Sequence, residues 1–242
     1  MRPQFSFKGQ SSESFTGFIV SELPPISKPP KRVETITIDG RDGDITEFLG
    51  YEAYNKEIQV GLSKGYDIDA LFEWLDGSGD LVMSNEPDKL YKAEIIDGID
   101  FERLVNFRKG KIRFHVQPYK YKAIEGIKLF APNTASGSVS VTNEGNTQAM
   151  PDIYLNLTGT LTLNVNGSYC CMISAGATSE SVTLFCEKEE IRASLFDESK
   201  ALKTFKMSGE FPILKKGANT ISFSVTDGTL FRIHFRKFSR WI

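Results

Sequence analysis

Two histidines and three cysteines are the residues of this chain best suited to bind a metal or to act in catalysis. His115 and His234 fall on the polar sides of alternating segments, and arginines stand on both sides of His234. Neighbouring cations lower the pKa of a histidine and disfavour the binding of a further cation. No His-Glu-x-x-His or Cys-x-x-Cys pattern supplies zinc ligands. We therefore expect no metal, no cofactor and no histidine-based acid–base catalysis.

The three cysteines indicate buried thiols rather than disulfides. Cys170 and Cys171 are adjacent, and a bond between neighbours would be strained. Cys186 ends an apolar run at residues 182–186. Free thiols in strands are typical of a protein that is made in a reducing cytoplasm.

A cluster of three aspartates at residues 39–44 could in principle hold calcium or act as paired acids. These aspartates alternate with Gly40 and Gly43, a composition that favours turns. The order of an EF-hand loop and its terminal glutamate are missing, and no glycine-rich phosphate loop occurs in the chain. This segment therefore predicts a turn, and without a catalytic constellation we do not expect an enzyme.

The balance of charge excludes further classes of function. The 242 residues include 29 Lys and Arg against 31 Asp and Glu, a formal net charge of −2. General nucleic-acid binding requires an excess of cations, so we expect no specific binding to nucleic acid. No run approaches the roughly 20 apolar residues of a membrane helix, and no signal-peptide pattern follows Arg2. We therefore expect neither membrane insertion nor secretion by that route.

The first part of the chain alternates in the manner of β-strands. A strand is predicted at residues 33–38, followed by the turn at 39–44. A polar loop through Tyr51 and Tyr54 then leads to a strand at 57–62. The residues of that strand expected to face inward are Ile58, Val60 and Leu62.

One helix is predicted, at residues 67–76. Asp67 is its expected N-cap and Gly77 its expected stop, and a turn should follow at 77–79. Its apolar stripe has the spacing of one helix face and consists of Ile68, Leu71, Phe72 and Leu75.

Further strands are expected at residues 91–96, 104–107 and 112–117. Alternation in the last of these places Ile112, Phe114 and Val116 inward. Because proline cannot donate to a strand ladder, Pro118 should end this strand.

The composition of the sequence changes near residue 130, where Ser, Thr, Asn and Gly become frequent. Short alternating segments with turn signals between them predict an antiparallel sandwich. These segments are 139–141, 153–157, 161–165, 182–185 and 221–225. The sequence thus predicts two domains, at residues 1–130 and 131–242. A final strand at 230–238 could return to pair with the first domain.

Seven segments, in order and in register with these elements, resemble the siphophage distal tail protein (Dit) family, whose members belong to long non-contractile phage tails. The segments are PKRVETITIDGRDG (30–43), LDGSGDL (75–81), PDKLYKA (87–93), IRFHVQPY (112–119), VTNEGN (141–146), MPDI (150–153) and GEFPILKKGAN (209–219). Each motif is weak alone, but they occur in a matching order and spacing, so that the resemblance extends over nearly the whole chain.

This resemblance implies a mainly β chain: an N-terminal β-barrel-like, tail-tube-related domain with one α-helix, then a C-terminal galectin-like β-sandwich. It implies a structural role in the virion, at the phage tail tip, as a hexameric hub ring that joins the tail tube to the baseplate or host-recognition device. The implied partners are further copies of the chain, the tail tube protein, a tail-associated hub or lysin protein, and receptor-binding or baseplate proteins.

The resemblance also assigns candidate residues for contacts between subunits. The matching loop would run from 40 to 56, with Arg41, Tyr51 and Tyr54 as the candidates. Tyrosine is favoured at interfaces because it buries area at a low entropy cost. In the alternative interpretation, the two tyrosines cap one end of the barrel.

A second hypothesis makes the chain a carbohydrate-binding module of a phage host-adsorption apparatus. Sugar sites stack an exposed aromatic ring on the sugar, yet Trp74 falls in the predicted helix and Trp241 next to the chain end. The sequence also lacks the motifs of a true galectin site. We therefore favour a docking surface for the second domain. A cell-wall hydrolase has no supporting motif.

Overall fold

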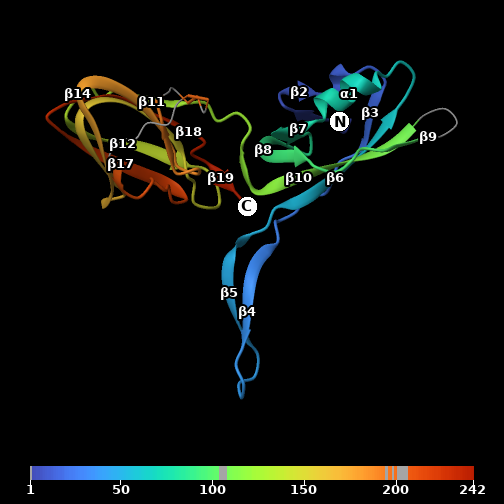
Figure 1. Ribbon diagram of the computed structural model, residues 1–242, viewed down its shortest axis with the longest axis horizontal. Coiled ribbons are helices and arrows are strands. Elements are labelled where there is room, and N and C mark those ends of the chain that lie inside the picture. Colours follow the sequence, from blue (N-terminus) through green and yellow to red (C-terminus); the bar gives the residue numbers. More distant parts are fainter. Residues whose placement is uncertain (1, 104–107, 194–195, 198, 201–206) are drawn as a thin grey trace. The chain divides into compact units, whose positions relative to one another are not determined.

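The computed structural model describes residues 2–103, 108–193, 196–197, 199–200 and 207–242. These residues are mainly β-strand, with one α-helix among them (Figure 1). The chain divides into two compact units, Met1–Ala123 together with Ile242, and Ile124–Trp241. Each unit has its own hydrophobic core. We call them unit 1 and unit 2.

Unit 1 is built on a curled antiparallel sheet with the strand order β2-β1-β7-β8-β10-β6-β3, and β9 also pairs with β10. A short 3₁₀ helix, η1, spans Ser12–Ser14. The strands are β1 (Phe5–Phe7), β2 (Gln10–Ser11), β3 (Phe18–Glu22), β6 (Tyr54–Leu62), β7 (Gly77–Met83), β8 (Glu86–Ile95), β9 (Phe101–Arg103) and β10 (Arg108–Lys122). Two further strands, β4 (Lys31–Thr37) and β5 (Asp44–Tyr51), form a separate two-stranded sheet. The strand expected at 104–107 lies outside the described residues.

Alternation along β6 and β10 builds the core of unit 1. The residues expected to face inward on these two strands are all at most 1 % exposed, which confirms the prediction. They meet an aromatic cluster around Trp74, whose ring lies 5.3 Å from that of Phe5 and 4.5 Å from that of Phe15 between centroids. The indole Nε1 donates a hydrogen bond to the carbonyl oxygen of Phe7 at 3.0 Å. This bond ties the helix to the first strand of the sheet.

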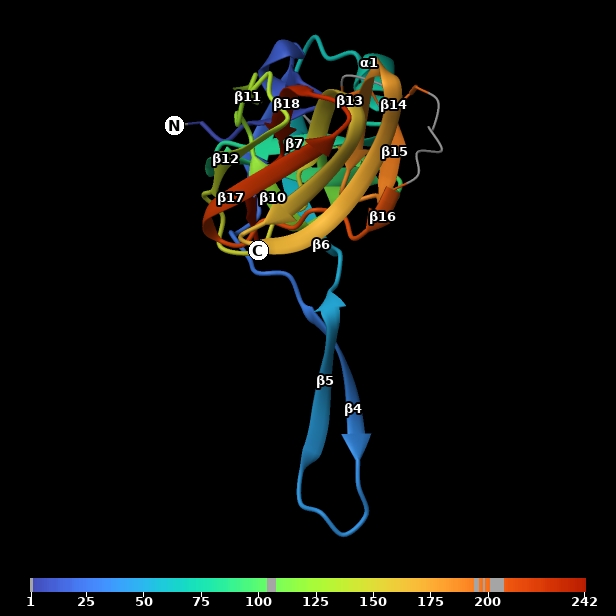
Figure 2. The same cartoon turned by 90° about the vertical axis from the view of Figure 1, so that its left-hand side faces the viewer.

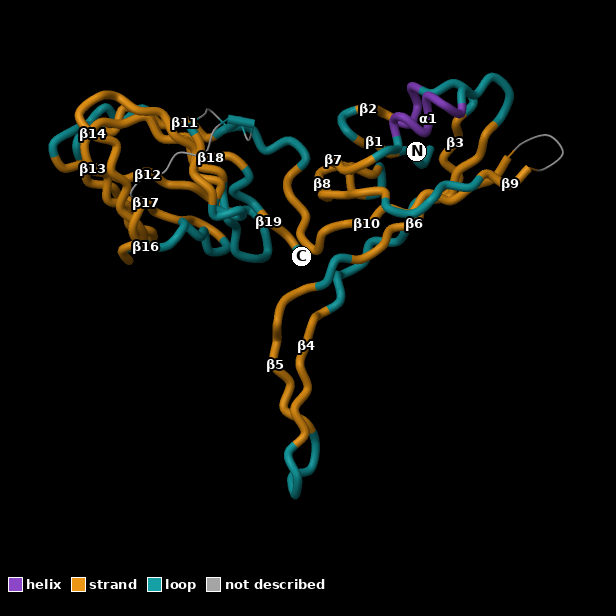
Figure 3. Tube along the Cα trace, in the orientation of Figure 1, coloured by secondary structure: helices purple, strands orange, loops and turns teal. Residues whose placement is uncertain are grey.

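The helix α1 spans Ile68–Trp74, close to its predicted range (Figure 3). The carboxylate of Asp67 accepts hydrogen bonds from the backbone N–H groups of Asp69 and Ala70, both at 3.1 Å, so the predicted N-cap is confirmed. The turn expected at 77–79 is wrong, because these residues begin β7. Gly79 is needed there for close approach, since a Cβ atom would lie 2.6 Å from the Lys8 side chain.

Strand β10 continues past Pro118 to Lys122, so the predicted end at that proline is wrong. Its pairing with β8 shifts register between Val116 and Lys120. Residues at such an irregularity do not form the regular ladder hydrogen bonds, so proline is tolerated there although it has no N–H group to donate.

Unit 2 is an antiparallel β-sandwich. Its strands are β11 (Lys128–Phe130), β12 (Ser136–Asn143), β13 (Asp152–Val165), β14 (Ser168–Phe185), β15 (Glu190–Arg192), β16 (Met207–Gly209), β17 (Gly217–Thr226) and β18 (Leu230–Arg236). Two residues near the chain end form β19 (Arg240–Trp241). Unit 2 begins at Ile124, before the change of composition near residue 130, because β11 pairs with β18. Strand β18 pairs with β11 and β13, both in unit 2.

The segments expected as separate strands at 153–157 and 161–165 are one strand, β13. Register shifts beside Gly159 let this strand pair with β14 throughout and change its second partner from β18 to β17. Gly159 has φ +75°, and a Cβ atom there would lie 2.4 Å from the carbonyl oxygen of Thr226. The core of unit 2 also holds Cys170, Cys171 and Cys186, which are free and buried as expected.

Within the part of the chain that the structure describes, no helix is long and apolar enough to cross a membrane.

The cap of α1 makes a first testable prediction. Replacement Asp67→Ala should lower the free energy of unfolding by about 1 kcal/mol, because two backbone N–H groups lose their acceptor. The matched control Asp69→Ala removes an equally acidic side chain next to the cap and should change stability by less than about 0.5 kcal/mol. Urea denaturation checks both values. Equal losses in the two variants would show that the cap does not stabilise the helix.

Candidate subunit interface

Strands β4 and β5 form a hairpin that projects from the rest of unit 1, which we call the arm (residues 31–51) (Figure 2). Among the described residues, these two strands pair only with each other. The polar loop expected through Tyr51 and Tyr54 is therefore wrong, because residues 44–51 are strand β5 and Tyr54 begins β6. The longer loop at 40–56 that the resemblance implies is likewise mostly strand. The loop of the hairpin is confined to residues 38–43.

The backbone register places an aromatic cluster on one face of the arm, near its root. Val33 lies opposite Phe48, and Lys31 lies opposite Tyr51. The rings of Phe48 and Tyr51 meet edge to face with centroids 5.1 Å apart, and Lys31 Nζ lies 5.7 Å above the Phe48 ring. Farther along the same face, Thr35 is paired with a second threonine.

The other face of the arm combines apolar and acidic pairs. Ile36 lies opposite Ile45, and Glu34 lies opposite Glu47. Like charges directly opposite each other on a sheet destabilise it, and no lysine or arginine of the described residues forms an ion pair with either glutamate. The arm therefore carries an uncompensated acidic pair next to an apolar one.

Six large apolar side chains of the arm are 39–53 % exposed. They are Val33, Ile36, Ile38, Ile45, Phe48 and Leu49. An isolated two-stranded hairpin is at best marginally stable in water, and an exposed strand edge readily pairs with another chain. The arm thus has the composition of a surface that is covered in an assembly.

Hydrogen bonds fix the root of the arm to the body of unit 1. The connector before β4, residues 23–30, contains four prolines. It is held by Lys56 Nζ, which donates to the carbonyl oxygen of Pro25 at 3.1 Å. The side-chain amide of Asn85 donates to the carbonyl oxygen of Pro24 at 2.9 Å. The ring of Tyr51 meets that of Tyr119 on β10 with centroids 6.1 Å apart. The arm is therefore anchored where it leaves the sheet.

A group of buried polar side chains lies beneath this root. Lys56 is 1 % exposed, and Lys120 Nζ pairs with Glu86 at 2.9 Å in a buried salt bridge. The hydroxyl of Tyr91 also bonds to Glu86, and the hydroxyl of Tyr54 is buried. One carboxylate in this group faces two ammonium groups. Burial, more than any neighbouring charge, lowers the pKa of Lys56 and raises the pKa of both tyrosines.

The three residues proposed for subunit contacts lie at opposite ends of the arm. Arg41 is exposed in the hairpin loop, where its N–H donates to the carbonyl oxygen of Ile38 at 3.2 Å. Tyr51 and Tyr54 lie at the root, the latter already in β6. Sequence reasoning missed the apolar residues of β5, because apolar Ile45 and Leu49 share a face with acidic Glu47 and so give no apolar–polar alternation.

The residues first considered for chemistry are dispersed. Within the described ranges, no group of three or more His, Cys, Asp or Glu side chains is placed to hold a metal ion. Asp44 accepts a hydrogen bond from the hydroxyl of Thr37 at 3.0 Å at the end of the hairpin strands. His115 Nδ1 lies 3.1 Å from the side-chain oxygen of Asn55. His234 lies against Tyr154, and burial followed by the charge of Arg232 lowers its pKa.

The buried lysine predicts how stability depends on pH. Because the pKa of Lys56 is lower in the folded state than its ordinary value of 10.5, the unfolded chain binds more protons between these two values. The free energy of unfolding should therefore rise with pH in that window, and the variant Lys56→Met should lack this contribution. Urea denaturation between about pH 7 and 9.5 measures it, below the range in which tyrosines of the unfolded chain ionise.

The control for this experiment is Lys111→Met, which removes an exposed lysine on β10. This variant should keep the slope of stability against pH found in the unaltered protein. If Lys56→Met shows the same slope as the control, Lys56 is not held with a lowered pKa.

Comparison with known proteins supplies a fold match. No protein-family model and no curated protein matches the sequence. The crystal structure of Dit (gp 19.1) of phage SPP1, described as a paradigm of hub adsorption apparatus in phages that infect Gram-positive bacteria, matches with a TM-score of 0.70 and 18 % identity over 100 % of both chains. A chain of the phage P2 baseplate in its activated conformation matches at 9 % identity with a TM-score of 0.47, over 94 % of this chain and 99 % of that one. The chain therefore has, over its whole length, the mainly β fold of a phage distal tail protein.

Proposed function

We propose that this chain is a structural, non-enzymatic subunit of a phage tail, and that copies of it form a hexameric hub ring. The observation that carries this proposal is the arm, which exposes six large apolar side chains on a hairpin with no other strand partner among the described residues. The fold shared with SPP1 Dit, a hub protein, supports the same role.

The free energy gained by burying the arm can be compared with the cost of association. Burying the exposed halves of its apolar side chains contributes about 1 kcal/mol for each residue. Loss of translational and rotational freedom costs about 4–15 kcal/mol on association. The free energy that the arm contributes offsets only the lower end of that cost. Further contacts along unit 1 must therefore complete the interface. An arm that docks on a different surface of the next subunit makes a heterologous contact, which closes into a ring when the rotation allows.

In this role the ring joins the tail tube to the baseplate or host-recognition device at the tail tip. Its partners would be the tail tube protein, a tail-associated hub or lysin protein, and receptor-binding or baseplate proteins. The near-neutral net charge of −2 suits a ring through which DNA passes, because a strongly cationic channel would retain the phosphate backbone. Synthesis would take place in the cytoplasm of the host bacterium.

The mass of the purified protein tests this proposal. Light scattering should give about six times the chain mass of 27.1 kDa, and negative-stain images should show rings. Replacement Phe48→Glu should weaken self-association at least about tenfold, because an unpaired charge would be buried at the interface. The matched control Leu129→Glu changes an apolar residue of unit 2 that is 62 % exposed and should leave the mass unchanged.

A second variant separates loss of assembly from loss of folding. Replacing residues 32–50 by a short Gly-Ser linker removes strands that, among the described residues, pair only with each other, so the remaining protein should melt cooperatively and stay monomeric. Rings formed by this variant, or a strictly monomeric parent protein at high concentration and in the presence of tail tube protein, would contradict assembly through the arm.

A further inference from the structure

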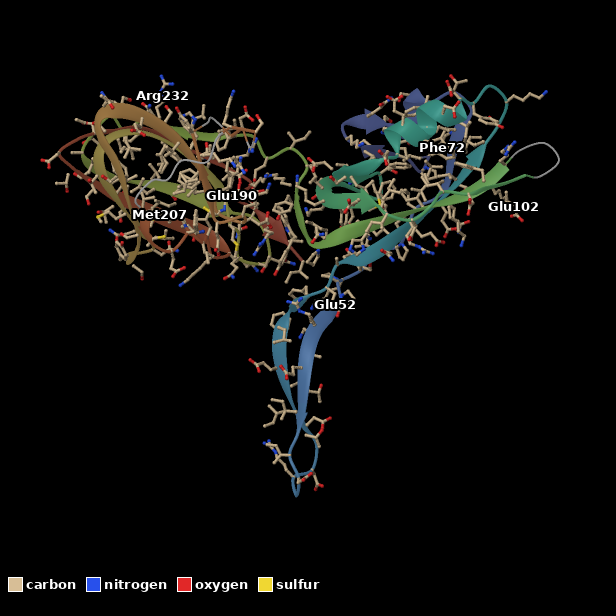
Figure 4. All side chains as sticks on the ribbon, in the orientation of Figure 1. Glu52, Phe72, Glu102, Glu190, Met207 and Arg232 are labelled. Atoms are coloured by element: carbon tan, nitrogen blue, oxygen red, sulfur yellow. The ribbon has the colours of Figure 1, made fainter. Side chains whose placement is uncertain are left out.

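Unit 2 has a groove of about 490 Å³ on its surface, distinct from the arm. We call it the unit 2 groove. Its lining comes from the loop before β12 and from β13, β14 and β18, and consists of Ala131, Asn133, Asn156, Ser179, Phe231 and Arg232. All six residues are exposed or partly exposed. Figure 4 shows Arg232 at the outer surface of unit 2.

Backbone pairing fixes the positions of the polar groups in this groove. Asn156 in the middle of β13 lies opposite Arg232 of β18 and, on its other side, opposite Ser181 of β14. Directly opposed residues of an antiparallel pair project from the same face of the sheet, with Cβ atoms about 5 Å apart. The side chains of Asn156 and Arg232 therefore start from neighbouring positions on one face of the sheet.

The hydrogen bonds of Asn156 leave its side-chain oxygen, Oδ1, available to accept a hydrogen bond from a ligand. Its Nδ2 donates to Ser179 Oγ at 3.2 Å, to Ser181 Oγ at 2.9 Å and to the carbonyl oxygen of Glu180 at 3.3 Å. These acceptors orient the amide, and Oδ1 accepts no hydrogen bond from any described residue. The groove therefore offers an oriented acceptor with unused capacity.

Arg232 supplies the complementary donors. Its side chain is exposed, and within the described residues it makes no ion pair and no hydrogen bond. A guanidinium group has five N–H donors and binds a carboxylate or a phosphate through two parallel bonds. The exposed amide of Asn133 adds a donor and an acceptor, and the partly exposed ring of Phe231 adds an apolar surface.

This set of groups suits a saccharide. Saccharides present hydroxyl groups that both donate and accept, and one face of C–H groups that packs against an aromatic ring. The lining holds one arginine and no acidic side chain, so its formal charge is positive. We infer that the unit 2 groove binds an acidic saccharide, with its carboxylate or phosphate on Arg232, its hydroxyls on Asn156 and Asn133, and its apolar face on Phe231.

This inference does not depend on the proposed ring. Binding in unit 2 requires only residues 131, 133, 156, 179, 231 and 232 of one chain. A chain whose arm is replaced should therefore bind as the full chain does, so failure of one proposal leaves the other open to its own test.

Saturation-transfer difference NMR on the full chain tests the inference, because it observes the ligand and tolerates a large oligomer. Trigalacturonate serves as the acidic probe and maltotriose as the neutral one. We expect saturable transfer to trigalacturonate, with maltotriose bound at least about tenfold more weakly. Arg232→Gln should reduce the affinity for trigalacturonate about tenfold, as expected for the loss of a charged hydrogen-bonding partner. Asn156→Ala should weaken the binding of both probes.

The matched control is Lys216→Gln, which removes the same charge from an exposed position outside the groove. It should leave affinity unchanged, and thermal melting should show that all variants are folded. The inference is overturned if neither probe shows saturable transfer, if both bind equally, or if Arg232→Gln binds trigalacturonate as the control does. Equal affinity for a poly-glutamate peptide would also overturn it and would indicate a surface for acidic protein segments.

Discussion

The backbone ladder through β3, β6 and β10 is the constraint on which unit 1 depends. Strand β6 is paired on both sides, with β3 and with β10, so its side chains must alternate between the core and the outer face. Only residues 52–53 separate β6 from β5 of the arm. The position of the arm root is therefore set by a strand that cannot shift register without moving Ile58, Val60 and Leu62 out of the core.

Local periodicity was enough to predict the elements whose two sides differ in burial. The inward faces of β6 and β10 and the helix with its Asp67 cap were predictable, because a residue repeat or a cap leaves its signal within a few positions. Strand β5 escaped prediction because both faces of the arm are exposed, so burial imposed no contrast between polar and apolar positions. The continuation of β10 past Pro118 depends on pairing with β8, which is remote in the sequence.

The arm and the unit 2 groove also depend on pairing that the sequence does not reveal. Tyr51 could be named from the resemblance, whereas its contact with Phe48 follows from a hairpin register that no short motif encodes. The unit 2 groove joins residues near 131, 156, 179 and 231. Nothing in the linear sequence brings these four segments together, and the sugar-site motifs sought in the sequence would not have found them. Its chemistry emerges only from the pairing of β18, β13 and β14.

The opposed glutamates of the arm have a consequence for the order of assembly. If two arms met through the faces that carry Glu34 and Glu47, four carboxylates would come together in a desolvated contact, which is strongly unfavourable. Symmetric arm-to-arm dimers could not grow into a ring, because each arm would be covered by another arm and could not bind a different surface of the next subunit. Repulsion between like faces would thus keep newly made subunits apart in solution until each arm meets an unlike surface.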